Sequence, residues 1–208
     1  SWGANMTSYH MYLAKKPPLR ADGLPNLEGL KMRATGTYRP LFRALGATTI
    51  NIKSSEVITA IQRGTVDGFG FTDVSLAAIG LHTVTKYRVQ PNFYQTNTVE
   101  TVNLASWKAL SQAHKDMLNR MAIEYEVTSV QYVEAERLKE EVQMKAAGVK
   151  DIVLTGKAKA KYLEIAHGEI WKELKNRSKY HDQLKRLLYH PGKANRQLKI
   201  KQQLDMKR

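Results

Sequence analysis

The sequence predicts an α/β fold built around a mixed, mostly parallel sheet. Residues 30–71 alternate short apolar or β-branched runs with helix-like runs, and such alternation is typical of βαβ units with right-handed crossovers. From about residue 107 the apolar residues instead recur at three and four positions, which indicates a long amphipathic helix. Further amphipathic runs at 157–176 and 180–189 indicate two more helices.

Each element within the alternating region has its own signal. Ser54 or Ser55 can cap the second helix, Glu56 lies in its first turn, and Gly64 is a suitable terminator. The strand that follows Ala47 is rich in β-branched residues. The predicted order is a strand at 30–34, a helix at 37–45, a strand at 47–52, a helix from 54 to 64, and a strand at 65–71.

The remaining segments give weaker signals. A short helix is predicted at 74–84, with Asp73 as its cap, and strand character occurs at 93–96 and 100–105. One helix of about 40 residues, roughly 60 Å long, is predicted from Trp107 to Ala147. The predicted division is a hinge strand at 1–20, an α/β lobe at 21–106, a long bridging helix at 107–148, closing elements at 149–190, and a basic tail at 191–208.

The net charge of +14 indicates an anionic partner. The chain has 33 Lys and Arg residues against 19 Asp and Glu, so its field attracts nucleic acid, anionic membranes and small acids alike. The stretch from Lys185 to Arg208 is rich in Lys, Arg and Gln. It is interpreted either as a solvated tail or as a nucleic-acid-binding arm. The absence of cysteine excludes a disulfide framework and a thiolate metal site.

Catalytic signatures are missing from the sequence. It contains no nucleophile elbow, no phosphate-binding loop and no His-Glu-x-x-His motif. The six histidines are scattered, and none has a metal-ligating partner at helical spacing. We therefore expect no catalysis, no cofactor and no metal. The alternative of an enzyme on the same scaffold would depend on Asp73, the best candidate base near Arg33.

Arg33 is the leading candidate for a binding residue. It stands at the end of the predicted strand 30–34, just before a helix starts. In open α/β sheets, ligands bind at the carboxyl ends of the strands. A guanidinium there is shaped to hold a carboxylate with two parallel hydrogen bonds. The alternative is that Arg33 is a surface salt-bridge partner.

Aromatic residues near the strand ends can supply the walls of a small pocket. Phe71 closes the third predicted strand, Phe93 and Tyr94 lie in a loop-like stretch, and Tyr9 lies near the start of the chain. A small acid held by an arginine still has an apolar body that rings can cover. The alternative is that these rings belong to the core. Asp73 can accept a hydrogen bond from a ligand or act only as the helix cap.

These residues also carry a family resemblance. Asn26-Leu27-Glu28-Gly29-Leu30-Lys31-Met32-Arg33 resembles the "DLKGLKIR" signature of TRAP transporter solute-binding proteins of the DctP type. The run from Leu45 to Gly68, which includes Ser55-Glu56-Val57-Ile58-Thr59-Ala60-Ile61-Gln62-Arg63-Gly64, is similar to the family's "LGA…P…SEVYTALQRGVVDG". The match runs in order from about residue 8 to 175.

The resemblance implies a periplasmic binding protein of two α/β lobes joined by crossing strands and a long helix. Arg33 matches the arginine that grips the ligand carboxylate in that family. The chain departs from it at Gly70-Phe71, where many relatives have Glu-Trp. Relatives also have a whole first lobe before the hinge strand. We therefore expect this chain to be the carboxyl-terminal two-thirds, with apolar surface exposed on the long helix.

The resulting expectation is an extracytoplasmic, periplasmic solute-binding protein that captures a small organic acid for the membrane subunits of a TRAP transporter. Arg33 would anchor the carboxylate, Phe71 and Phe93 would form ring walls, and Tyr9, Thr35 and Asp73 would make polar contacts. Self-association through the surface left by the first lobe is a further expectation. The alternative function is nucleic-acid binding by the basic tail.

Overall fold

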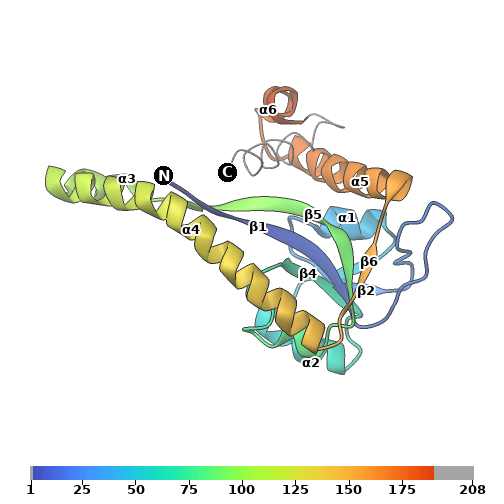
Figure 1. Ribbon diagram of the computed structural model, residues 1–208. Helices are drawn as coiled ribbons and strands as arrows, with labels where there is room; N and C mark the ends of the chain where they lie inside the picture. The colour runs from blue at the N-terminus through green and yellow to red at the C-terminus, as the bar shows by residue number, and fades with distance from the viewer. Residues whose placement is uncertain (1, 190–208) are drawn as a thin grey trace.

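A six-stranded mixed sheet organises the part of the chain that the computed structural model describes, residues 2–189 (Figure 1). The strand order is β3-β2-β4-β1-β5-β6. The strands are β1 (Trp2–Leu13), β2 (Lys31–Arg33), β3 (Thr48–Ile50), β4 (Gly68–Thr72), β5 (Tyr87–Glu100) and β6 (Lys150–Val153). The predicted tail at 191–208 lies outside the described residues.

Three of the five strand pairings are parallel, in the mixed sheet that the sequence predicts. β2 pairs in parallel with β3 and β4, and β5 pairs in parallel with β6. The central strand β1 is antiparallel to both of its neighbours, β4 and β5. Because β1 runs against β4, its residue Tyr9 lies opposite Thr72 at the carboxyl end of β4. This crossing strand therefore brings its own side chains to the edge where β2 and β4 end.

Helices cover both faces of the sheet (Figure 1). They are α1 (Arg39–Ala44), α2 (Val57–Gln62), α3 (Leu104–Ala109), α4 (Gln112–Ala146), α5 (Gly156–Lys175) and α6 (His181–Leu188), with short 3-10 turns η1 (Ser54–Glu56) and η2 (Leu81–Thr83). One core cluster joins α1 and α5 to the sheet through Phe42, Tyr162 and Phe93. The cluster on the other side joins α2 and α4 to the sheet through Val57, Met144 and Phe69.

The predicted single helix at 107–147 is wrong at its amino-terminal end. Helix α3 ends at Ala109, and α4 begins separately at Gln112. Ser111 has extended backbone angles, and its hydroxyl accepts a hydrogen bond of 3.2 Å from the amide of His114. A serine in that conformation caps a new helix instead of continuing the old one. The strand predicted at 100–105 is also wrong, because Asn103 caps α3 through two backbone amides.

The predicted helix at 74–84 is likewise wrong, since only the short turn η2 is helical there. Ser75 and Gly80 have φ angles of 66° and 78°, which a right-handed helix does not accommodate. The side chain of Glu140 in α4 accepts a hydrogen bond from the amide of Ala77 and holds the loop in place. Asp73 is therefore not a helix cap, and that alternative is excluded.

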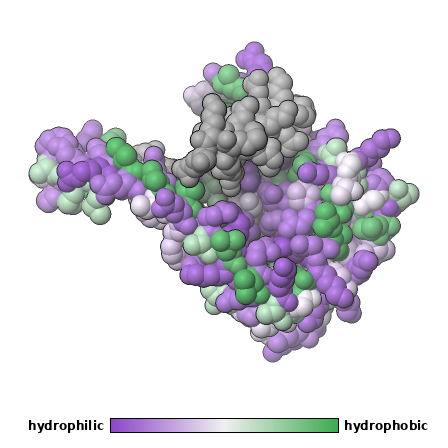
Figure 2. Space-filling view, viewed as in Figure 1, coloured by the Kyte–Doolittle hydropathy of each residue, from purple (hydrophilic) through white to green (hydrophobic). Residues whose placement is uncertain are grey.

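Helix α4 extends well beyond the sheet together with the free ends of β1 and β5 (Figure 1). Its buried residues are Ser129, at the middle of the helix, and Val133, Glu140 and Met144 in the carboxyl-terminal half. Large apolar side chains elsewhere on it are exposed, and Figure 2 shows hydrophobic patches among the hydrophilic residues of the projecting arm. The expectation of exposed apolar surface on the long helix is confirmed. These side chains are Met117, Met121, Ile123, Tyr125, Val127, Val130, Tyr132, Leu138 and Val142.

Despite its length, α4 is no membrane span. Within residues 2–189, none of the helices combines the length with the hydrophobicity that crossing a bilayer requires.

Candidate ligand-binding edge

The candidate site lies where β2 and β4 end beside the middle of β1. Arg33 is the last residue of β2, and it pairs with Phe69 in β4. Thr72 is the last residue of β4, and it pairs with Tyr9 of β1. Thr35 follows β2 by two residues and is half-buried. The topology thus brings Arg33, Thr35 and Tyr9 to the carboxyl edge where such sheets bind ligands.

Arg33 is buried, with 6% of its surface exposed, and neutral groups hold its guanidinium. Its Nε donates to the carbonyl oxygen of Ile52 over 3.1 Å. Nη1 donates to the hydroxyl of Tyr38 over 2.8 Å and to the carbonyl of Gly70 over 3.2 Å. Nη2 donates to Oγ of Ser54 over 3.1 Å. The side chain is therefore fixed in one position before any ligand arrives.

No carboxylate within residues 2–189 forms an ion pair with Arg33. The interpretation of Arg33 as a surface salt-bridge partner is therefore wrong, because the side chain is neither exposed nor paired. A buried charge without a counter-charge costs several kcal/mol, which hydrogen bonds to neutral groups offset only in part. An anion that reached this guanidinium would remove that cost.

Tyr38 contacts Arg33, and the sequence analysis did not predict this contact. Its hydroxyl donates to the carbonyl of Gly70 over 2.7 Å while accepting from Arg33. Burial raises the pKa of the Tyr38 hydroxyl. A Cβ atom on Gly70 would lie 2.4 Å from Cε2 of Tyr38. Glycine at position 70 thus makes room for the ring that positions Arg33. The sequence shows Tyr38 only as one apolar residue of the predicted helix.

Ser54 has a different role from the predicted one. Neither Ser54 nor Ser55 caps the helix; Lys53 is the residue before η1, and the Glu56 side chain accepts from the Lys53 amide. The Ser54 hydroxyl lies instead beside Arg33. A capping serine and a serine beside an arginine look the same in sequence, because the second contact spans 21 positions.

The predicted ring walls fall on opposite faces of the sheet. Tyr9, Tyr38 and Phe93 form one group, with ring centroids 5.7 to 6.4 Å apart. Phe93 belongs to β5, not to a loop, and has no exposed surface. Phe71 is half-buried and packs with Phe69 in the cluster under α2 and α4. The structure therefore brings Phe93 and Tyr9 together but does not bring Phe71 to them.

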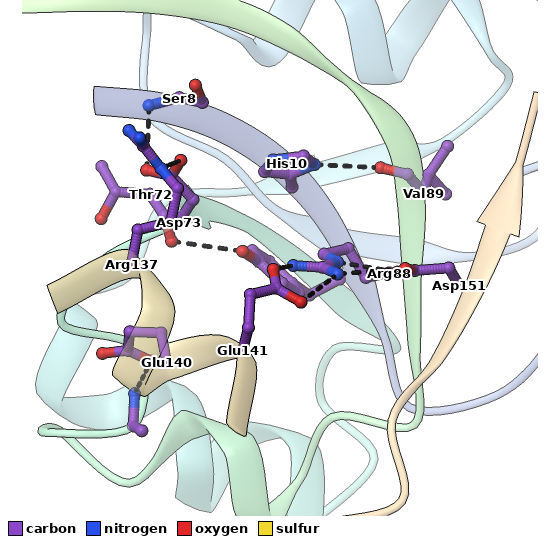
Figure 3. A network of polar contacts seen from close by, with 12 residues as sticks. Ser8, His10, Thr72, Asp73, Arg88, Val89, Arg137, Glu140, Glu141 and Asp151 are labelled. Atoms are coloured by element: carbon purple, nitrogen blue, oxygen red, sulfur yellow. Dashed lines mark hydrogen bonds and ion pairs between the residues drawn. The ribbon is translucent and has the colours of Figure 1, made fainter. Parts of the chain in front are cut away.

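Asp73 uses both of its carboxylate oxygens within the protein (Figure 3). Oδ1 accepts from the amide of Ser8 over 3.0 Å, and Oδ2 accepts from Nε of Arg137 over 2.7 Å. The amide of Asp73 also donates to the carbonyl of Ser8 over 2.8 Å. Arg137 lies on α4 and additionally pairs with Glu134. Asp73 therefore joins the end of β4 to β1 and to the long helix.

A second polar network in Figure 3 holds α4 about one helical turn beyond Arg137. Arg88 of β5 is buried and binds Asp151 of β6 and Glu141 of α4 through two hydrogen bonds to each. Burial lowers the pKa of Arg88, but the hydrogen bonds that it donates to these two carboxylates outweigh burial and raise it overall. Close by, Nδ1 of His10 donates to the carbonyl of Val89 over 3.2 Å. These contacts fix α4 against the sheet.

Nothing at this edge forms a metal site of the usual kind. Within the described residues, no group of three or more His, Cys, Asp or Glu side chains is arranged to hold a metal ion.

Comparisons with known proteins identify the family and the fold of this chain. The family model of bacterial extracellular solute-binding proteins, family 7 (DctP), matches residues 12–177. Among solved structures, a TRAP periplasmic solute-binding protein from Rhodoferax ferrireducens with bound malonate is 18% identical, with a TM-score of 0.73. That match covers 91% of this chain and 63% of the other.

Two further solved structures are similar to this chain. A TRAP periplasmic solute-binding protein from Desulfovibrio salexigens with bound orotic acid is 20% identical, with a TM-score of 0.72, covering 89% of this chain and 59% of that one. One from Pseudomonas putida F1 with bound D-glucuronate is 21% identical, with a TM-score of 0.69, covering 90% and 59%. These likenesses confirm the predicted α/β fold of the periplasmic-binding-protein type. The chain spans less than two-thirds of the length of each of these proteins.

Proposed function

Because this chain belongs to the bacterial extracellular solute-binding proteins of family 7, we propose that it binds a small organic acid with Arg33 as the carboxylate anchor. One observation carries the proposal. Arg33 is buried at the carboxyl edge of the sheet and is held by neutral groups, with no carboxylate paired to it among the described residues. A ligand carboxylate would supply the missing counter-charge.

The bound molecules of the similar structures support an organic acid. Malonate, orotic acid and D-glucuronate, which those proteins hold, each carry a carboxyl group. Their remaining parts differ widely in size and polarity. A shared carboxylate anchor with variable surroundings is the simplest arrangement that accommodates all three. We therefore propose only that the ligand of this chain carries a carboxylate, and we do not propose any one of these compounds as its ligand.

The hydrogen bonds of Arg33 indicate how a ligand would approach. A guanidinium has five N–H groups, and Ile52, Tyr38, Gly70 and Ser54 accept four of them. The remaining N–H belongs to Nη2, the nitrogen that also contacts the Ser54 hydroxyl. An incoming carboxylate would accept from Nη2 and displace or share that hydroxyl. Such binding needs little movement of Arg33 itself.

The other predicted site residues receive roles that fit their positions. Tyr9 and Thr35 are half-buried at the same edge, and we propose that they contact the ligand. Phe93 supports Tyr9 from behind, and Phe71 would form a wall from the opposite side of β4. Asp73 would not contact the ligand directly, because both of its oxygens already accept hydrogen bonds from the protein. It would instead hold Ser8 and Arg137 in place near the site.

The wider biological role follows the family. We propose that the ligand is handed to the membrane subunits of a TRAP transporter outside the cytoplasm, without a catalytic step. The lobe at 21–106 would close over the ligand by a hinge motion at the strand within 1–20 and the bridging helix at 107–148, with the elements at 149–190 completing the closure. The exposed apolar face of α4 would pack against further protein. Nothing in the described residues favours nucleic-acid binding by the tail.

Titration followed by nuclear magnetic resonance tests the proposal. The Nε–H signal of Arg33 and the amides at the edge should shift saturably with malonate or D-glucuronate. Arg33→Ala should abolish the shifts at Tyr9 and Thr35 while the circular dichroism spectrum is kept. Arg63→Ala, which removes an exposed arginine at the end of α2, is the matched control and should bind like wild type. Equal responses from both variants would refute the anchor role.

A further inference from the structure

A concave surface lined by lysines lies at the opposite edge of the sheet from Arg33. It is open to solvent, has a volume of about 440 Å³ and is lined by Lys15, Lys16, Lys86 and Lys150, with Tyr87 and Gly148 between them. Four side chains of like charge around one hollow repel one another. We propose that this hollow, called the lysine hollow below, binds a small polyvalent phosphate-type anion. The proposal does not depend on the function proposed for Arg33.

Backbone hydrogen bonds fix the three chain segments that carry these lysines. The amide of Lys86 donates to the carbonyl of Leu13 over 2.9 Å, and the amide of Lys150 donates to the carbonyl of Lys86 over 2.9 Å. Tyr87 of β5 pairs with Leu13 on one side and with Lys150 on the other. The charges therefore converge through the sheet register of β1, β5 and β6 and not through a basic run in the sequence.

The lysines of the hollow have no ion-pair partner among residues 2–189. The nearest carboxylate in sequence, Asp151, already binds Arg88. Gly148 lies just beyond the end of α4, whose carboxyl end contributes the equivalent of about half a negative charge. That partial charge is small against four ammonium groups, so the hollow remains strongly positive.

The chemistry of the side chains suits a phosphate group. All four cations are lysines, whose compact ammonium groups act as point charges and bind phosphate without requiring a planar partner. At the opposite edge of the sheet, Arg33 has a planar guanidinium, which is suited to a planar carboxylate. A volume of about 440 Å³ lies within the range of small-ligand pockets. A ligand with several negative charges would offset more of the lysine repulsion than a monovalent one.

Calorimetric titration with pyrophosphate in about 0.15 M salt tests the lysine hollow on the 208-residue chain. Lys86→Ser/Lys150→Ser should weaken pyrophosphate binding at least tenfold. Lys157→Ser/Lys159→Ser removes the same charge from exposed positions of α5 and should change affinity less than twofold. Equal weakening in both variants, or no binding by folded wild type, would overturn the proposal.

Two further titrations decide the class of anion. Citrate, which is also polyvalent but carries only carboxylates, should bind at least fivefold more weakly than pyrophosphate; equal binding would overturn the phosphate assignment. Vesicles of phosphatidylglycerol should sediment the wild-type chain and the Lys86→Ser/Lys150→Ser variant equally. If vesicle binding alone depends on Lys86 and Lys150, the hollow binds a lipid headgroup, and a free small anion is excluded as its ligand.

Discussion

Arg137 of α4 donates a hydrogen bond of 2.7 Å from Nε to Oδ2 of Asp73, at the point where β4 ends. The two residues are 64 positions apart. Asp73 is buried, whereas Arg137 is about a quarter exposed. The pair connects the candidate binding edge to the long helix that projects from the sheet. If the helix moves relative to β4, either this contact breaks or Asp73 moves together with Arg137.

Removing the carboxylate of Asp73 should destabilise the fold. In Asp73→Ala, the amide of Ser8 and Nε of Arg137 both lose their acceptor, while Nη1 of Arg137 keeps its contact with Glu134. Unsatisfied groups of this kind cost about 1–3 kcal/mol each, and solvent around Arg137 reduces the effect. We expect the free energy of unfolding to fall by about 2 kcal/mol in urea denaturation. Lys139→Gln, which breaks the exposed pair with Glu136, should leave the free energy of unfolding like that of wild type.

A second prediction concerns the close contact of Gly70 with Tyr38. Gly70→Ala would place a Cβ atom 2.4 Å from the Tyr38 ring, and overpacking of a buried site costs about 1–3 kcal/mol. The displaced Tyr38 hydroxyl would also release Arg33, so we expect weaker binding of carboxylates. Gly36→Ala is the matched control, because nothing lies within 4 Å of a Cβ there. It should leave unfolding and binding unchanged.

A double-mutant cycle separates the two effects of this contact. Tyr38→Ala removes the ring that Gly70→Ala would meet, so the double variant should lose less than the sum of the single variants. Additive losses in urea denaturation would show that the ring does not restrict position 70. Tyr38→Phe keeps the ring and removes only the hydroxyl that contacts Arg33 and Gly70. Unchanged binding in Tyr38→Phe would argue against a positioning role for that hydroxyl.

Much of the fold follows from local sequence signals, and much of the site does not. The alternation at 30–71 predicts β2, α1, β3, α2 and β4 in the right order, because each buries one apolar face of its own. The position of Arg33 at the end of a strand follows from the same pattern. The carboxyl edge could therefore be located from sequence, although the ligand-binding roles of its residues stay predictions.

What the sequence does not show is mostly long-range. The contact of Arg33 with Gly70 spans 37 positions, and that of Asp73 with Arg137 spans 64. The hydrophobic periodicity of a sequence does not indicate which distant residues contact one another. The length of β5 is hidden for a different reason: residues 95–100 are exposed and therefore lack the apolar alternation of a half-buried strand. Ser111 resembles any exposed helical serine until its extended backbone is seen.

The stability of the fold should depend on pH through His10. Burial lowers the pKa of His10 below its usual value, although its contact with Val89 opposes this. The unfolded chain therefore binds a proton near pH 6.5, while the folded protein takes it up only at lower pH. Since the unfolded state holds more protons in that interval, the free energy of unfolding should fall as pH drops below about 6.5. One histidine contributes at most about 1.4 kcal/mol per pH unit.

Urea denaturation between pH 7.5 and 5 measures this slope. His10→Gln should flatten the pH dependence, because glutamine has no proton to gain. His114→Gln is the control at an exposed position of the first turn of α4, and it should keep the wild-type slope. Burial also lowers the pKa of His167, so some dependence should remain in His10→Gln. A slope unchanged by His10→Gln would assign the effect to other groups.

The exposed apolar face of α4 should make the isolated chain associate. Ile123 and Val127 are 66% and 62% exposed and lie one helical turn apart, and apolar surface of this kind marks interaction sites. We expect sedimentation coefficients that rise with protein concentration. Ile123→Lys/Val127→Glu keeps the net charge, should change the free energy of unfolding by less than about 0.5 kcal/mol, and should abolish that rise.

The matched control for this surface lies away from the helix. Leu19→Glu/Val153→Lys replaces two other exposed apolar side chains, at 52% and 63% exposure, with the same pair of charges. If α4 carries the association, this variant should sediment like wild type, because its substitutions leave the helix face intact. Two results would show that the apolar face of α4 does not drive self-association. The wild-type chain could stay monomeric at every concentration, or the control variant could dissociate as fully as Ile123→Lys/Val127→Glu.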